Sequence, residues 1–194
     1  MNPFIDLRDP PPKRRLSCDD NQEKHFTEAA VMIAFALYLL ENGATAVELH
    51  PDGEHGKRHD LKVNLESHGF SLNSPIGTTQ YGGVYRRGRQ TLTIALRPGL
   101  GDVIGRIGDQ TVVAECKGGI INTRHSGQAS KLRKGLFETI GMLLTRPLAH
   151  ERLVVVMPAT IAIRRVAIRV LPRVRAAGIE IALVEESGEV SLLQ

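Results

Sequence analysis

The order of patterns along this 194-residue chain predicts an α/β sandwich, in which helices flank a mixed central β-sheet. Three observations carry this prediction. A strongly apolar helix pattern covers residues 29–40, a β-hairpin pattern surrounds Gly108-Asp109, and residues 126–184 then read as helix, strand, helix and strand. The length and the 42% hydrophobic content suffice for one domain with a sizeable core.

Composition narrows the class of protein. The net charge of +4 permits a polyanionic partner but does not establish one. Cys18 and Cys116 are too few for a disulfide framework or a cysteine zinc site, which fits a reducing cytoplasm. The apolar run at 29–40 is shorter than the roughly 20 residues of a membrane span. We therefore expect a cytoplasmic protein with no membrane association.

The first 20 residues predict a flexible, Pro-rich and basic arm, because Pro10-Pro11-Pro12 precede Lys13-Arg14-Arg15. The arm is either simply solvated or in contact with a nucleic-acid backbone. Residues 21–194 are expected to form the single domain. Asp20 and Glu23 have the spacing of a capping box, which predicts a helix from there to Asn42-Gly43.

Residues 45–49 predict a strand, and residues 50–89 predict an inserted region of loops with a short helix at 58–67. Its histidines and acids, within 50–60, match no zinc spacing and suit a substrate-contacting loop. At the end of this region, Arg86 and Arg87 lie beside tyrosines. That pattern suits a nucleic-acid groove, although a plain hairpin would explain it as well. Residues 91–96 predict the next strand.

The most informative stretch is 98–119, which predicts a tight hairpin. With Gly108-Asp109 as a two-residue turn, Ile107 pairs with Gln110 and Asp102 falls opposite Glu115. Directly opposed residues have Cβ atoms about 4.5–5.5 Å apart, so the two carboxylates repel unless a cation lies between them. Alternation puts Lys117 on the same face and Cys116 on the other. The other interpretation is a turn-capping Asp102 and an exposed Glu115–Lys117 ion pair.

Two carboxylates beside a lysine are suited to binding Mg²⁺, or Mn²⁺ in its place. Such a site is typical of phosphodiester hydrolysis. Asp102 followed by Glu115-Cys116-Lys117, at the end of an apolar strand and before a helix, resembles the PD-(D/E)XK nuclease superfamily. Gly101 stands where the family's name has Pro. The resemblance implies a restriction-endonuclease-like fold, metal binding by Asp102 and Glu115, and a catalytic role for Lys117.

The resemblance also suggests further site residues. Glu28, just before the apolar run, corresponds to an additional acid on the first helix. A first-turn glutamate favoured by the helix dipole is the alternative. Gln128 and Lys131, on a helix expected from Ser126 to before Pro147, correspond to residues that face the scissile phosphate. Arg124 and Lys134 complete a basic surface, which is either a nucleic-acid contact or a solvated face.

A strand at 153–157, a helix at about 160–177 and a strand at 179–184 complete the predicted sheet, with a last short strand after them. The sequence therefore predicts a Mg²⁺-dependent nuclease that acts on DNA in preference to RNA, with a homodimer left open. The alternative is a non-cleaving nucleic-acid-binding protein on the same fold. Nothing specific supports a purely structural subunit.

Overall fold

The computed structural model describes residues 2–12, 22–52, 59–146 and 150–194. Its main sheet has nine strands in the order β12-β11-β10-β8-β7-β3-β6-β5-β4. The strands are β3 (Ala46–Leu49), β4 (Ser71–Pro75), β5 (Gly83–Arg87), β6 (Gln90–Ile94), β7 (Val103–Ile107), β8 (Gln110–Cys116), β10 (Arg152–Pro158), β11 (Ile179–Val184) and β12 (Val190–Leu192). With four helices in the described residues, the expected mixed α/β class is confirmed.

The sheet is mixed, and the change of direction lies at β8. Strand β8 pairs parallel with β10 and antiparallel with β7, while β10 pairs parallel with β11. Strand β3 runs antiparallel to β7 and parallel to β6. The strand expected at 91–96 is therefore β6, and it is separated from the hairpin by β3. The C-terminal end of β8 thus lies between two strands of opposite direction near the middle of the sheet.

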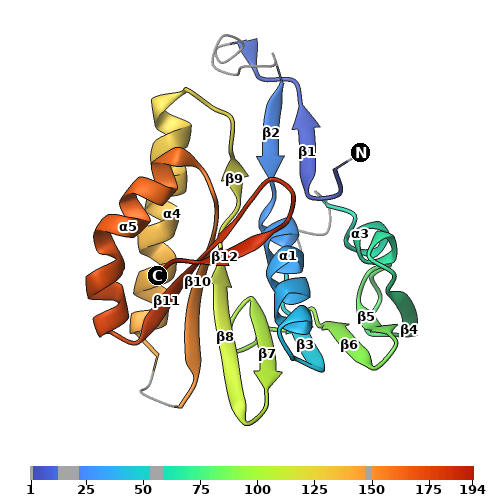
Figure 1. Ribbon diagram of the computed structural model, residues 1–194. Coiled ribbons are helices and arrows are strands. Elements are labelled where there is room, and N and C mark those ends of the chain that lie inside the picture. Colours follow the sequence, from blue (N-terminus) through green and yellow to red (C-terminus); the bar gives the residue numbers. More distant parts are fainter. Residues whose placement is uncertain (1, 13–21, 53–58, 147–149) are drawn as a thin grey trace.

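Helix α1 (Glu28–Glu41) covers one face of this sheet (Figure 1). Every residue from Ala29 to Leu37 is buried, so the helix is apolar all round, as expected of a helix enclosed by other elements. Its partners in the core include alternate residues of the central strands, such as Ala114, Cys116, Val154 and Val156. Among the described residues, no helix has both the length and the apolarity needed to cross a membrane.

Helices α4 (Ser126–Leu144) and α5 (Ile161–Ala176) lie side by side on the opposite face (Figure 1). An apolar stripe at helical spacing lies on the buried side of α4, formed by Leu132, Leu136, Ile140 and Leu143. They pack against residues such as Val155, whose side chain points away from α1. Burying one such side chain contributes roughly 1.5–3 kcal/mol. The molecule is therefore a layered structure of helix, sheet and helices.

The N-terminal expectations need correction. Ile5–Arg8 forms β1, which pairs with β2 (Glu23–Phe26), and β2 pairs with β9 (Gly119–Ile120) in a second, three-stranded sheet. The predicted capping box was wrong, because Glu23 belongs to β2 and its carboxylate lies 2.9 Å from His25 Nε2. Thr27 caps α1 instead, with its hydroxyl accepting a hydrogen bond from the Ala30 amide. Lys13, Arg14 and Arg15 lie outside the described residues.

The region at 50–89 contributes to the sheet. Helix α3 (Leu61–Ser67) begins at the Asp60 cap and is followed by Gly69 with φ +80°. Strands β4 and β5 then form an antiparallel edge that extends the sheet beyond β6, so residues 71–87 form a hairpin, and contact of Arg86 and Arg87 with nucleic acid stays a prediction. Part of the histidine-containing loop, residues 53–58, lies outside the described residues.

Candidate functional site

The β7–β8 hairpin has the predicted register. Ile107 pairs with Gln110 and Val103 pairs with Ala114, so Asp102, the residue before β7, falls opposite Glu115. The turn depends on Gly108, whose φ of +57° suits a residue without a side chain. Strand alternation then places the side chains of Asp102 and Glu115 on the face that carries Val113.

Backbone contacts on both sides position Asp102. Its carbonyl oxygen accepts a hydrogen bond of 2.9 Å from the amide of His50, at the end of β3. Its carboxylate Oδ2 accepts one of 2.7 Å from the amide of Cys116. The preceding Gly101 is closely packed, because a Cβ there would lie 2.8 Å from the carbonyl oxygen of Ala114. This contact explains why a small residue stands where the resembled family's name has Pro.

Glu115 is a buried carboxylate, with 5% of the residue exposed. Burial and, to a lesser degree, the charge of Asp102 together raise its pKa to about 7, while Arg146 and Lys117 oppose the shift. The guanidinium of Arg146, just beyond the end of α4, lies 3.3 Å from Glu115 Oε1. The positive charges of Arg146 and Lys117 partly neutralise this carboxylate.

Lys117 reaches the start of α1, where its Nζ lies 3.5 Å from Glu28 Oε2. The pKa of Glu28 is raised to about 7, chiefly by burial and also by the charges of Asp102 and Asp52, while Lys117 opposes the shift. Burial lowers the pKa of Lys117, but the charges of Glu28, Glu138 and Asp102 outweigh burial, so this pKa lies above its ordinary value. Lys117 is therefore a charged ammonium between acidic side chains.

Two glycines permit this close arrangement. A Cβ on Gly118 would lie 2.4 Å from the Glu28 amide nitrogen, so only glycine lets the end of β8 pass so near the start of α1. A Cβ on Gly135 would lie 3.3 Å from Lys117 Cγ, so α4 approaches the lysine there. The amide of Lys117 also donates a hydrogen bond of 3.1 Å to the carbonyl oxygen of Val156 in β10.

Helix α4 carries the other residues expected near the phosphate. Gln128 and Lys131 lie on the same helical face as Gly135 and Glu138, at spacings of three and four residues. A rise of 1.5 Å per residue puts Lys131 about 6 Å and Gln128 about 10 Å along the axis from Gly135. Lys131, Lys134 and Arg124 are exposed. The charge of Glu138 acts on Lys117, and Glu138 lies only about 4.5 Å along the axis from Gly135.

Arg86 and Arg87 lie far from the carboxylates of Asp102 and Glu115. Three strands separate β5 from β8, which corresponds to about 19 Å at the usual strand spacing. Arg87 donates a 3.0 Å hydrogen bond to the carbonyl oxygen of His68 and lies over the ring of Phe70, at 4.6 Å from its centroid. The structure gives Arg87 a role in packing and separates both arginines from the carboxylates.

The donor set can be tested against a metal. Among the described residues, no group of three His, Cys, Asp or Glu side chains is arranged to hold an ion. Mg²⁺ needs only one or two protein carboxylates when water and phosphate supply the other oxygens, and the opposed pair of Asp102 and Glu115 meets that need. Cys116 takes no part, because it is fully buried on the α1 side and burial raises its thiol pKa.

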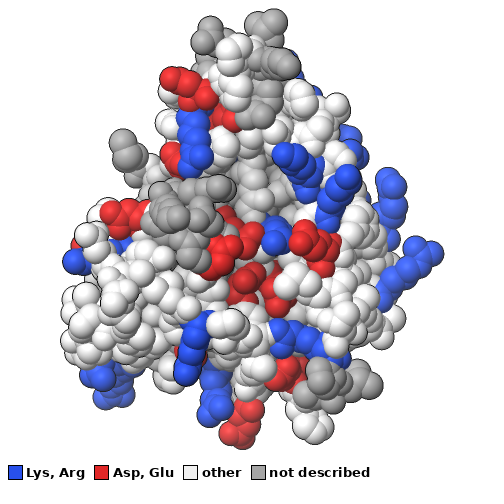
Figure 2. Space-filling model, turned by 180° about the vertical axis from the view of Figure 1, so that it is seen from behind, with Lys and Arg blue, Asp and Glu red and all other residues white. Residues whose placement is uncertain are grey.

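The surface also carries acidic and basic side chains in separate zones. Figure 2, seen from behind, shows acidic side chains gathered near the centre of that face, with Lys and Arg side chains around them. A central concentration of carboxylates attracts a cation, and the surrounding basic side chains can contact a polyanion.

Several residues at the site were missed by sequence reasoning. Arg146, just beyond α4, acts on Glu115, Glu138 of α4 acts on Lys117, and Asp52 acts on Glu28 from the segment after β3. No spacing in the sequence signals these long-range contacts. Gly118 could have been identified, since consecutive glycines directly after a charged strand end indicate a close backbone approach.

Comparison with protein-family models, with curated proteins and with solved structures finds no match to this chain. The candidate site therefore rests on its own geometry and chemistry.

Proposed function

We propose that this protein is a Mg²⁺-dependent nuclease that hydrolyses phosphodiester bonds, in DNA rather than RNA, on a restriction-endonuclease-like fold. The observation that carries the proposal is the hairpin register, which opposes Asp102 and Glu115, with Lys117 close enough for its charge to interact with both. A carboxylate pair of this kind has no purpose in a structural hairpin, because opposed like charges destabilise it.

Asp102 and Glu115 are the residues that would hold the metal. When bound there, Mg²⁺ supplies positive charge that offsets the negative charge developing on the phosphate. The Cys116 amide, which donates to Asp102, holds that carboxylate in place. The pKa of Glu115 near 7 means that the carboxylate gives up its proton readily at neutral pH, and a cation beside it favours the ionised form.

Lys117 and Glu28 serve the reacting water and phosphate. The Lys117 ammonium donates hydrogen bonds to a phosphate oxygen and orients the attacking water. Glu28, 3.5 Å from that ammonium, holds it toward the site, and its pKa of about 7 suits a group that accepts or returns a proton at neutral pH. Lys131, Lys134 and Arg124 on the exposed side of α4 and the segment before it contact the nucleic-acid backbone.

The test is incubation of purified protein with plasmid, linear and single-stranded DNA, and with RNA, with and without Mg²⁺ or Mn²⁺. The proposal expects metal-dependent cleavage by the wild type and none by Asp102→Asn. Equal cleavage by both proteins would assign the activity to a contaminant. No cleavage of any substrate under any metal would contradict the proposal.

A non-cleaving nucleic-acid-binding protein is the second candidate, and one observation favours it. Glu28 and Glu115 each have a basic side chain as an ion-pair partner, namely Lys117 and Arg146, which offsets their charge. Calorimetric titration with Mg²⁺ separates the two candidates. Binding that is lost in Asp102→Asn favours the nuclease, and nucleic-acid binding with no metal binding favours the second candidate.

A further inference from the structure

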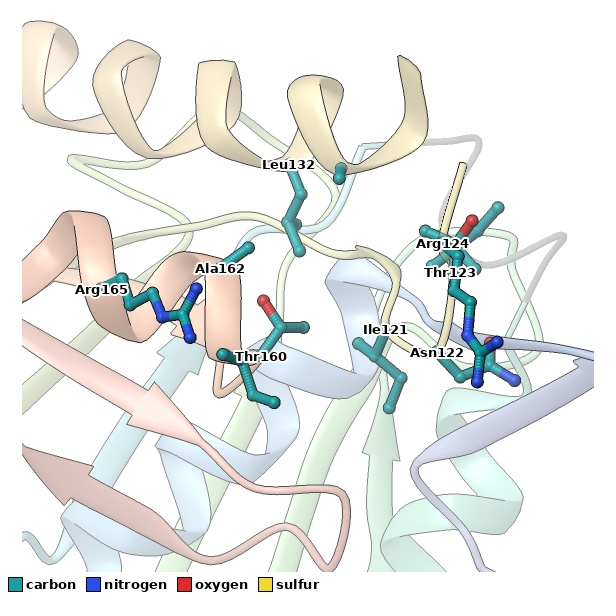
Figure 3. Close-up of a pocket in the computed structure, with 11 residues that line it drawn as sticks. Ile121, Asn122, Thr123, Arg124, Leu132, Thr160, Ala162 and Arg165 are labelled. Carbon is teal, nitrogen blue, oxygen red and sulfur yellow. The ribbon is translucent and has the colours of Figure 1, made fainter. Parts of the chain in front are cut away.

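A pocket of about 310 Å³ lies outside the carboxylate site, between the beginnings of α4 and α5 (Figure 3). The segment at 121–124 forms one wall and the first turn of α5 forms the other. Figure 3 shows Leu132 reaching from α4 toward the pocket, with Arg165 and Arg124 on opposite sides. Pockets of about 300 Å³ and above are of the size that holds small organic ligands.

The lining combines apolar and cationic groups. Ile121, Ala129, Leu132 and Ala162 provide apolar surface, and Arg124 and Arg165 provide positive charge. Within the described part of the chain, no carboxylate lies within ion-pair distance of Arg165, which is exposed at the rim. Apolar side chains suit the faces of a base, and guanidinium groups suit phosphate oxygens.

The pocket adjoins the carboxylate site through α4 and β9. Leu132 packs on Gly119, where a Cβ would lie 2.9 Å from Leu132 Cδ1. Gly119 is two residues beyond Lys117, and Gly135, three residues beyond Leu132, lies against Lys117 itself. A single strand of nucleic acid can therefore contact both places along one helix.

We propose that this pocket binds one nucleotide of the substrate strand, next to the phosphate that is cleaved. The base packs on Leu132 and Ile121, and its phosphate pairs with Arg165. The inference rests on the proposed function only in that the substrate is nucleic acid; binding to the pocket needs no metal and no cleavage.

The experiment measures binding in EDTA, so that no cleavage takes place. The probes are thymidine 5′-monophosphate, followed by NMR, and a fluorescein-labelled oligothymidylate, followed by anisotropy. Arg165→Ala removes a charged hydrogen-bond donor and should weaken oligonucleotide binding about tenfold. Arg169→Ala, which removes another exposed arginine one turn further along α5, is the matched control and should bind as the wild type does.

A second pair of variants tests the apolar lining of the pocket. Ala162→Trp fills the pocket and should abolish the chemical-shift changes caused by the mononucleotide, whereas Ile168→Trp, at an exposed position of the same helix, should leave them intact. If Ala162→Trp does not fold, Arg165→Ala decides alone. Oligonucleotide binding by Arg165→Ala at wild-type strength overturns the inference even if the protein cleaves DNA. A mononucleotide bound in the pocket by a protein that never cleaves upholds this inference and contradicts the proposed nuclease.

Discussion

Replacing Glu115 with Gln should make the metal-free protein more stable at high pH. The pKa of Glu115 rises from an ordinary 4.5 to about 7 on folding, because the side chain is buried beside Asp102. The folded protein therefore holds this proton more tightly than the unfolded chain. The resulting stabilisation is complete below about pH 4.5 and is lost as the pH rises through 7.

The size of the effect follows from the two pKa values. At about 1.36 kcal/mol per pKa unit, the contribution of Glu115 to the free energy of unfolding falls by about 2.5 kcal/mol between pH 5 and pH 8. Glu115→Gln mimics the protonated acid, so it should remove that loss, less whatever the Arg146 ion pair contributes at pH 8. For a chain of this length, about 2.5 kcal/mol corresponds to roughly 5–10 °C in Tm.

Urea denaturation at pH 5 and pH 8, without divalent metal, measures the effect. The expected result is a free energy of unfolding that falls with pH in the wild type by about 2.5 kcal/mol more than in Glu115→Gln. Glu41→Gln, which removes an exposed carboxylate at the end of α1, should keep the wild-type pH dependence. Parallel pH profiles for the wild type and Glu115→Gln would refute the argument that Glu115 is a strained carboxylate.

Three further changes test other parts of the site. Lys117→Ala should slow cleavage about 10²–10³-fold while calorimetry shows unchanged Mg²⁺ binding, and a wild-type rate would remove this residue from the mechanism. Gly118→Ala places a Cβ 2.4 Å from the backbone at the start of α1, so urea denaturation should show a free energy of unfolding lower by about 1–3 kcal/mol. Wild-type stability of this variant would contradict the close approach. Replacing both Lys131 and Lys134 with Ala should reduce the slope of the logarithm of the duplex-DNA binding constant against the logarithm of the salt concentration by about 1.8. Lys62→Ala on α3 should leave this slope unchanged. An unchanged slope in the double variant would assign both lysines to solvation.

The hairpin and the main helices could be predicted from the sequence because their signals are local. Period-two alternation around Gly108-Asp109 determines the register of a two-residue turn, so the opposition of Asp102 and Glu115 follows without a structure. The stripe from Leu132 to Leu143 likewise identifies the buried face of α4.

The errors arose where distant segments decide the outcome. Asp20 and Glu23 have the spacing of a capping box, but pairing of β2 with β1 and β9 takes Glu23 into a strand. The insertion of β3 between β6 and β7 also depends on long-range pairing. Arg146 lies 31 residues from its partner Glu115 and contacts it only because α4 crosses the sheet. Local patterns contain no information about such contacts.

The central claim is that Asp102 and Glu115 form a metal site. Crystals soaked in Mn²⁺ at pH 8, with diffraction measured at the manganese absorption edge, test it most directly, because Mn²⁺ substitutes for Mg²⁺ and gives an anomalous signal. The account predicts an anomalous peak between the carboxylates of Asp102 and Glu115 in the wild type and none in Asp102→Asn. An empty site at saturating Mn²⁺, with Glu115 still paired to Arg146, would contradict it.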